Sequence, residues 1–363
     1  KTAPSANDVV IIEDSEDSDN KKQLSLGNLP VQQLNYCLNS RHDFWPDGVT
    51  LTSVQQTDAQ YFSHQWIVLT DTDQVLAISR HTDAAEKYCA KLEVDKAQKK
   101  FMIYQPIEAR ATRELQGKPA TLKMKFKRGA SNGTTQLRIG LLYYSSTSIV
   151  RDAVNSWGAT DTTPTMAGSW TMAQKSDLTT IGTSWTEVEM NIASLPSGGQ
   201  VLGLAWWIED SYNSGTSDEW YFGEVDFAPT LNDPYIISYF GKPFERDRCE
   251  NFFQSSWVDG THPDQGGVSA TIKTVLSRNV QDSGADVYLD RFNFRNPLRS
   301  TPTVTLFTEG GSSGQLSNLT KATSETAAAA NVSEIGFDWM YDDATQSDDG
   351  DILAGHWTAD ARL

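Results

Sequence analysis

Aromatic side chains lie within polar loops of this chain, where they could bind sugars. Sugars are held by flat aromatic rings against their C–H surfaces, with Asp, Asn and Arg side chains hydrogen bonding to the hydroxyls. Residues 150–177 are rich in Gly, Ser, Thr and Asp, yet they contain Trp157 and Trp170. We therefore predict a carbohydrate-binding loop with these two contacts. The alternative is that both rings pin a long loop onto the fold beneath it.

A second candidate region covers residues 208–221, where acidic and aromatic residues crowd a turn between two expected strands. Successive side chains alternate across a strand, so we expect Trp206 in the core and Trp207 in solvent. The predicted sugar contacts of this region are Trp207, Tyr212, Asn213 and Trp220. The alternative is an acidic hairpin loop with buried aromatic rings.

Catalytic and metal-binding motifs are weak. The histidines show no H-E-x-x-H spacing, and no G-x-S-x-G elbow is present. The acidic run DDATQSDDGD within residues 338–351 lacks the spacing of an EF-hand calcium loop. We predict a protein that is not an enzyme. Glycoside cleavage needs only two carboxylates, however, so the 47 acidic residues leave a polysaccharide depolymerase open.

Alternating polarity predicts that the elements carrying these residues are antiparallel strands. The clearest case is 121–127, where apolar residues alternate with lysines and leave one face wet. Similar patterns predict strands at 101–107, 137–143, 187–192, 201–208 and 220–227. Short helices are expected near 83–89 and 246–253. The predicted fold class is all-β, with a two-sheet sandwich of jelly-roll type in the middle.

Three segments are expected along the chain. Residues 1–30 contain two apolar runs around an acidic turn, which predicts a hairpin too small to be stable alone; a flexible acidic leader is the alternative. Residues 31–231 form the sandwich, and residues 232–363 form a smaller C-terminal β domain. Its expected strands are 268–276, 286–292, 303–307 and 335–340, with 324–330 as a helical turn or a loop.

Composition limits the partners. A net charge of −17 argues against nucleic acid, which is bound by basic surfaces. No run of about 20 apolar residues suggests membrane insertion. The three cysteines have no C-x-x-C spacing, which predicts free buried thiols in a protein assembled in a reducing cytosol. The first residue is Lys1 and not Met, which is typical of a fragment or a processed form.

Two segments of the chain resemble the opening and closing signatures of a tailed-bacteriophage tail-fibre family with a carbohydrate-binding-like jelly-roll module. The first is LNSRHDFWPDG followed by YFSHQWIVL, within residues 38–69. The second is GEVDFAPTLNDPYIISYFGKPFERDRCENFFQSSW, at residues 223–257. The pieces between them, IYQPIE, ELQGKPATLKMKFKRG, SWTEVEMNI and VLGLAWWIED, follow the order expected of such a module. Ser40, His64 and Gln65 depart from the family's pattern.

The resemblance implies a receptor-binding protein of a phage virion that attaches to host surface polysaccharide. Its expected partners are two sister chains in a homotrimer, other tail proteins and the glycan, with residues 1–30 as the attachment segment. The resemblance also implies that a structural calcium ion, if one is present, binds at Glu224 and Asp226. No other cofactor is expected. A depolymerase and a structural virion adaptor are the alternative functions.

Overall fold

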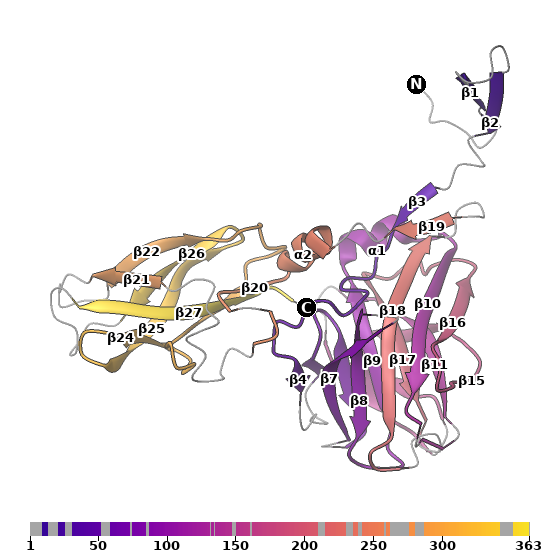
Figure 1. Ribbon diagram of the computed structural model, residues 1–363, viewed down its shortest axis with the longest axis horizontal. Helices are drawn as coiled ribbons and strands as arrows, with labels where there is room; N and C mark the ends of the chain where they lie inside the picture. The colour runs from indigo at the N-terminus through magenta and orange to yellow at the C-terminus, as the bar shows by residue number, and fades with distance from the viewer. Residues whose placement is uncertain are drawn as a thin grey trace.

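The structure is a computed structural model of the 363-residue chain (Figure 1). It describes residues 9–13, 21–25, 31–51, 59–72, 75–84, 87–130, 132–133, 135–146, 150–159, 162–209, 215–229, 235–238, 242–257, 259–261, 276–279, 287–341 and 351–362. Within these residues strands dominate, which confirms the predicted all-β class. No helix in the described ranges has the length and apolar character that a bilayer crossing requires.

The N-terminal hairpin is present. Strand β1 (Val9–Glu13) pairs antiparallel with β2 (Lys21–Ser25), with Val9 opposite Ser25 and Glu13 opposite Lys21. This hairpin lies apart from the larger sheets in Figure 1. The pairing agrees with the hairpin predicted from the two apolar runs.

One sheet of the sandwich has six strands in the order β16-β10-β18-β8-β7-β4. Lysines 123, 125 and 127 of β10 point to its outer face, while Leu122, Met124 and Phe126 are fully buried. The alternation predicted for this segment is therefore found. The strands are β16 (Thr186–Ile192), β10 (Ala120–Arg128), β18 (Glu219–Pro229), β8 (Lys87–Val94), β7 (Leu76–Asp83) and β4 (Thr50–Leu51).

The second sheet runs β14-β11-β17-β9-β6-β5, with β15 paired to β11 outside this path. Its central strands β9 and β17 are buried along their whole length. A short helix, α1 (Ala109–Leu115), follows β9. The strands are β14 (Trp170–Lys175), β11 (Gln136–Tyr144), β17 (Val201–Ile208), β9 (Phe101–Ile107), β6 (Ile67–Thr70), β5 (Gln60–Tyr61) and β15 (Thr179–Thr180).

The core of the sandwich is rich in aromatic rings. Trp206 lies between the sheets and packs edge-on against Phe101 and Phe126, with ring centroids 5.5 Å and 5.0 Å away. Phe222 stacks on Phe126 at 5.4 Å. Such ring pairs add specific geometry to the burial of apolar area, which is the main stabilising contribution of the core. The expectation that Trp206 is a core residue is confirmed.

The strand that precedes the sandwich in the sequence forms hydrogen bonds with the strand that follows it. Strand β3 (Val31–Leu34) runs parallel to β19 (Tyr235–Ser238), with Val31 opposite Tyr235 and Leu34 opposite Ser238. The two segments that flank the sandwich in sequence are therefore held side by side at one end of it, near α1 (Figure 1).

The C-terminal unit is a further sheet built around β27, which pairs with four other strands. Its core contains Phe337, Trp339, Leu353 and Trp357. Its strands are β20 (Phe253–Ser255), β21 (Leu276–Asn279), β22 (Val287–Asn293), β23 (Thr303–Phe307), β24 (Gln315–Asn318), β25 (Thr323–Ser333), β26 (Gly336–Tyr341) and β27 (Ile352–Asp360).

Two local predictions are wrong. The described part of 83–89 is not helical, because Asp83 ends β7 and Lys87 begins β8, and these two residues are opposite each other in the antiparallel pair. Residues 324–330 are neither a helical turn nor a loop, because they lie in β25 between β24 and β26. The helix expected at 246–253 is found in part, since α2 covers Lys242–Glu250 and Phe253 begins β20. Most of the strand expected at 268–276 lies outside the described residues.

Contacts between the sandwich and the C-terminal unit are ionic and aromatic. The Arg362 guanidinium binds Asp47 of the sandwich and Asp360 of β27, and it lies over the rings of Tyr61 and Phe253 at 4.2 Å and 4.4 Å. Asp259 accepts a hydrogen bond from the backbone N–H of Trp45 at 2.6 Å. The three cysteines are free and buried, as predicted.

Candidate carbohydrate-binding site

The face of the second sheet that points away from the core is covered by a loop. Apolar side chains of this face, among them Leu69, Met102 and Leu142, form a buried cluster with Ala153 and Val154 of the loop. The loop contains the short hairpin of β12 (Val154–Ser156) and β13 (Thr165–Met166). An apolar sheet face that would otherwise meet water is thus packed against residues of the same chain.

A buried lysine fastens this loop. The Lys100 side chain donates hydrogen bonds to the backbone carbonyls of Trp157, at 2.9 Å, and of Ala159. The hydroxyl of Tyr104 donates to the carbonyl of Arg151. The bonds donated by Lys100 satisfy its ammonium group, which would otherwise be costly to bury in a side chain that is only 2% exposed. The loop is therefore part of the packed structure in the described residues.

The predicted loop tryptophans take part in this packing. Trp170 is 3% exposed, donates from Nε1 to the carbonyl of Val150 at 2.7 Å, and packs against Tyr104 and Tyr144. Trp157 is half-buried against the same cluster. Trp170 therefore matches the alternative prediction, in which its ring holds the loop on the sheet and does not contact a sugar. Trp157 keeps part of its surface exposed, so its role as a sugar contact stays a prediction.

The predicted exposure of Trp207 is wrong. Alternation does place it opposite Trp206, but the face it reaches is the one covered by the loop, so its side chain is fully buried. Gly140 on the neighbouring strand makes room for it, since a Cβ there would lie 2.8 Å from the Trp207 ring. Trp220 is also fully buried, between the two sheets. Tyr212 and Asn213 lie outside the described residues.

Glu224 and Asp226 face the same side of β18, but their oxygens already have partners. Glu224 binds Arg41 and, at 2.9 Å, Lys125. Burial would raise the pKa of Glu224, yet these two cations outweigh it and hold that pKa below its usual value. Asp226 accepts a hydrogen bond from the Asn35 amide at 3.0 Å. Burial, followed by the charge of Glu224, raises the pKa of Asp226 to about 6.

A carboxylate that is already paired with two cations, as Glu224 is, is a poor ligand for calcium, which requires six to eight oxygens. The described residues hold no group of three or more His, Cys, Asp or Glu side chains that could bind a metal ion. In the acidic C-terminal run, Asp338 pairs with Arg291 at 3.3 Å and Asp351 pairs with Lys321 at 3.2 Å. Asp342, Asp343, Asp348 and Asp349 lie outside the described residues.

The outer face of the six-stranded sheet carries a different cluster, which we call the lysine-centred site: Lys127, Asp83, Trp185, Tyr221 and His81. The Lys127 ammonium lies over the ring of Tyr221 at 4.6 Å and over that of Trp185 at 5.2 Å. It also forms an ion pair with Asp83 at 2.6 Å. Both aromatic side chains are half-exposed. A cation between two rings is an arrangement of cation–π contacts that holds both rings in place.

Further contacts fix the orientation of these rings. The Trp185 indole N–H donates to the second oxygen of Asp83 at 3.1 Å. The Tyr221 hydroxyl donates to Glu219 at 2.8 Å, and the His81 ring meets Tyr221 at 5.1 Å between centroids. Burial and the bond to Glu219 raise the pKa of Tyr221 to about 12, so its hydroxyl keeps its proton at neutral pH. Preset aromatic rings beside hydrogen-bonding groups are the chemistry that sugar binding uses.

This site was missed in the sequence, although two signals pointed to it. The lysines of 121–127 mark the wet face of β10, and Lys127 is the register partner of Tyr221 on β18. Tyr221 follows the buried Trp220 directly and therefore faces the opposite side. Trp185 carries no such signal, because it lies just before the edge strand β16.

Two buried serine–histidine pairs are structural. Ser256 and His356 are 3.0 Å apart, and both are at most 1% exposed. Ser63 and His42 are 3.1 Å apart and equally buried. The Ser256 oxygen also accepts the backbone N–H of Trp357. A nucleophile for a polymer must be reachable from solvent, so neither pair can attack a polysaccharide in this structure.

Comparisons with known proteins give fold-level likeness only. No protein-family model and no curated protein matches this chain. Among solved structures, the carbohydrate-binding module TmCBM61 in complex with β-1,4-galactotriose is 11% identical with a TM-score of 0.31, over 54% of this chain and 99% of that chain. A putative sugar binding protein from Bacteroides thetaiotaomicron is 12% identical with a TM-score of 0.33, over 54% and 100%.

The enzymatically active domain of tailspike protein 4 of bacteriophage CBA120 is 10% identical with a TM-score of 0.31. That match covers 54% of this chain and 22% of the tailspike chain. Because all three TM-scores lie below 0.5, these matches carry no argument about the function of this chain.

Proposed function

We propose that this chain binds a cell-surface polysaccharide through the lysine-centred site. The observation that carries the proposal is the pair of half-exposed rings, Trp185 and Tyr221, which both contact the Lys127 ammonium, with Asp83 binding Lys127 and Trp185. Rings that are already oriented lose little conformational freedom when a sugar packs on them. Lys127 and Asp83 provide a donor and an acceptor beside the rings for sugar hydroxyls.

The setting we propose is the tail fibre of a phage, assembled in the host cytoplasm as a homotrimer that contacts other tail proteins. The support is the sequence resemblance at 38–69 and 223–257, together with the small hairpin of β1 and β2, which needs partners to be stable. One shallow site binds weakly. Three sites on one fibre raise the effective concentration of the next contact, so attachment becomes persistent without any new interaction.

Binding of purified host polysaccharide, measured by affinity electrophoresis, tests this proposal. Trp185→Ala and Tyr221→Ala should each weaken binding by roughly tenfold, because one stacked ring contributes about 1–2 kcal/mol. Tyr143→Ala is the matched control, since Tyr143 is a half-exposed ring on the other sheet. Trp157→Ala separates the two candidate regions: a loss confined to that variant would move the site to the 150–177 loop and overturn the lysine-centred site.

A second candidate, a polysaccharide depolymerase, has one specific observation in its favour. Glu224 and Asp226 face one side of β18, and their pKa values are shifted in opposite directions. Glycosidases combine an ionised carboxylate with a second carboxyl group whose raised pKa lets it donate a proton, and a pKa of about 6 would give Asp226 that role in a mildly acidic medium. Release of reducing ends from the polysaccharide, abolished in Asp226→Asn, would establish this activity. Binding without any release of reducing ends would exclude it for that polymer.

A further inference from the structure

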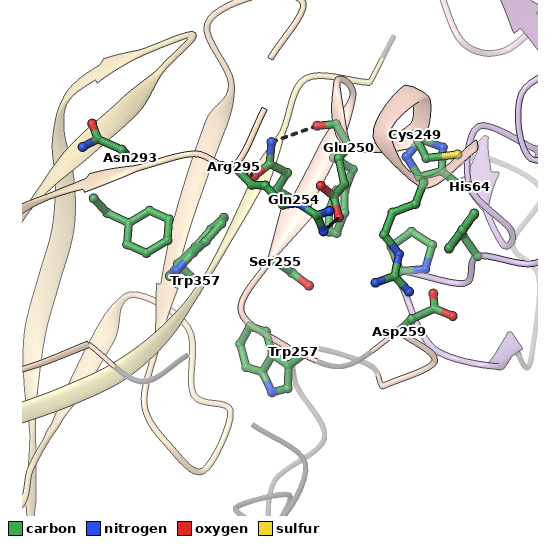
Figure 2. Close-up of a pocket in the computed structure, with 15 residues that line it drawn as sticks. His64, Cys249, Glu250, Gln254, Ser255, Trp257, Asp259, Asn293, Arg295 and Trp357 are labelled. Atoms are coloured by element: carbon green, nitrogen blue, oxygen red, sulfur yellow. Dashed lines mark hydrogen bonds and ion pairs between the residues drawn. The ribbon is translucent and has the colours of Figure 1, made fainter. Parts of the chain in front are cut away.

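A cavity lies at the junction between the sandwich and the C-terminal unit. It has a volume of about 270 Å³ and is lined from both sides, by Phe44 and Pro46 of the sandwich, by α2, and by Trp257, Phe292 and Trp357 of the C-terminal unit. In Figure 2 the labelled lining residues, among them His64, Cys249 and Trp357, come from separate elements of the chain. The volume lies near the lower end of the usual range for ligand pockets, about 300–1,000 Å³, so it suits one small unit and not an extended chain.

The walls of this cavity are aromatic and fixed. Trp257 packs edge-on against Phe307 with centroids 5.0 Å apart, and Trp357 packs against Phe292 at 4.6 Å. Both tryptophans are only 3% exposed, so their positions are set by the core of the C-terminal unit. The wall that they help to form is apolar and rigid, so it suits the C–H groups of a pyranose ring better than its hydroxyls.

The charged side chains of α2 are paired, with one exception. Lys242 binds Asp43 at 3.7 Å, and Glu245 binds Arg248 at 3.0 Å. Asp247 and Glu250 both bind Arg295, at 3.6 Å and 3.3 Å.

Arg246 is the exception among the described residues of this helix. It lines the cavity, and its guanidinium makes one contact, over the ring of Phe44 at 5.4 Å, without a carboxylate in ion-pair range among the described residues.

The other charged groups of the cavity wall are paired. Arg295 is neutralised by Glu250, and Asp259 accepts the backbone N–H of Trp45 at 2.6 Å and faces Arg80 at 3.4 Å. Burial lowers the pKa of His64 to about 3, so this lining residue is neutral at pH 7. The cavity thus offers one unneutralised guanidinium in a chain whose net charge is −17.

We propose that this cavity binds a sugar unit that carries a carboxylate, of the uronic acid class. The carboxylate would accept two parallel N–H bonds from Arg246, the geometry in which a guanidinium binds carboxylates best. The sugar ring would lie against the aromatic wall of Trp257 and Trp357. The inference deepens the proposed function, and it rests on that function for the polymer to which the sugar belongs. It specifies that the bound polysaccharide contains an acidic sugar. It also gives the chain a second binding subsite, at the junction between the sandwich and the C-terminal unit.

Titration calorimetry of the whole chain with D-glucuronate, D-galacturonate, D-glucose and acetate tests the cavity directly. The wild type should bind at least one uronate more tightly than glucose and acetate, because only the uronate uses both the guanidinium and the aromatic wall. Arg246→Gln should weaken uronate binding by at least roughly tenfold, the loss expected for hydrogen bonds to a charged group. Arg246→Lys should recover part of it, since a lysine keeps the charge but not the fork.

Arg110→Gln is the matched control, because it removes the same charge from the exposed surface of α1, where the Arg110 side chain is 84% exposed. It should leave uronate binding unchanged. Equal binding of glucose and glucuronate, or wild-type binding of uronate by Arg246→Gln, would overturn the inference. So would the absence of uronate binding to the wild type.

The two proposals fail in different ways. Trp185 lies on the outer face of the six-stranded sheet. The variant Trp185→Ala should therefore weaken polysaccharide binding and leave uronate binding unchanged. Polysaccharide binding without any uronate preference would remove the cavity and leave the proposed function standing. Uronate binding lost in Arg246→Gln, together with no binding of any polysaccharide, would support the cavity and refute the proposed function.

Discussion

Arg362, one residue before the chain's last residue, forms an ion pair with Asp47, which is 315 residues away in the sequence. The side chain of Arg362 is only 5% exposed, and its second partner is Asp360. Burial alone would raise the pKa of Asp360, but the guanidinium outweighs it and holds that pKa below its usual value. This one side chain therefore links the C-terminal strand to the start of the sandwich.

Arg362→Met should loosen that link. Removing the cation leaves two partly exposed carboxylates, 26% and 34% exposed, without their charged partner, which we expect to cost about 1–3 kcal/mol. We expect denaturant unfolding, followed by tryptophan fluorescence, to split into two transitions as the C-terminal unit unfolds first. Arg110→Met, which removes an exposed pair, should change the unfolding free energy by about 0.5 kcal/mol at most. A single unshifted transition in Arg362→Met would show that the link contributes nothing.

Acid should destabilise the chain through its buried histidines. Burial lowers the pKa values of His42 and His64 to about 3, below the 6.5 of an unfolded chain. Below pH 6.5 these histidines bind protons in the unfolded chain but not in the folded chain. The free energy of unfolding therefore falls as the pH drops toward 3. Each histidine contributes a slope of about 1.4 kcal/mol per pH unit. Urea unfolding at pH 7, 6, 5 and 4 measures this slope. A free energy of unfolding that stays constant over this range would contradict the prediction.

Asp226→Asn should stabilise the chain at alkaline pH. The pKa of Asp226 is raised from 3.8 to about 6, so the folded state holds this proton more tightly than the unfolded chain does. The cost of ionising it in place develops as the pH rises from 3.8 through 6 and is complete above that. Asparagine avoids this cost and can still accept the bond from Asn35. The gain, about 1–3 kcal/mol at pH 8 and near zero at pH 3, is read from thermal unfolding at both values.

Gly140→Ala should disturb the packing of Trp207. The added Cβ would lie 2.8 Å from the Trp207 ring and 3.0 Å from the sulfur of Met172, closer than such contacts allow. Overpacking of this kind costs about 1–3 kcal/mol. Gly198→Ala is the control, because its Cβ would meet nothing within 4 Å. Equal thermal midpoints for the two variants would refute the role given to Gly140.

Deleting residues 1–30 should test the proposed trimer. The β1–β2 hairpin is the segment we expect to hold sister chains together, so light scattering should give a trimer for the full chain and a monomer for the shortened chain. Adhesion to host cells should then fall by about 10²–10⁴-fold, the usual gain from multivalency, while binding of a short oligosaccharide is unchanged. A monomeric full chain would refute the avidity mechanism but not the binding site.

The strands were predictable where alternating polarity and a buried core agree. Residues 101–107, 201–208 and 303–307 form strands with the bounds expected from the sequence. The helix prediction at 83–89 failed although Ala and Glu are good helix formers, because helix propensity is a weak preference that the pairing of β7 with β8 overrides. The alanine-rich segment 324–330 became a strand for the same reason, since it has partners on both sides.

The candidate site was harder to predict than the strands. Alternation gave the side of the sheet to which Trp207 points, but a local pattern contains no information about the distant loop that covers that side. The lysine-centred site joins Asp83, Lys127, Trp185 and Tyr221 from separate strands and loops. Such a cluster exists only once the register of β7, β8, β10 and β18 is known.

The parallel pairing of β3 with β19 has a mechanical consequence. A pull applied between the N-terminal hairpin and the C-terminal unit would draw β3 and β19 along their axes in opposite directions. Hydrogen bonds between parallel strands are then loaded together, in shear, and do not open one after another like a zipper. Tension would pass from Val31–Leu34 to Tyr235–Ser238 and bypass the roughly 200 residues between them, so the proposed sugar-binding surface would keep its shape while the molecule is stretched.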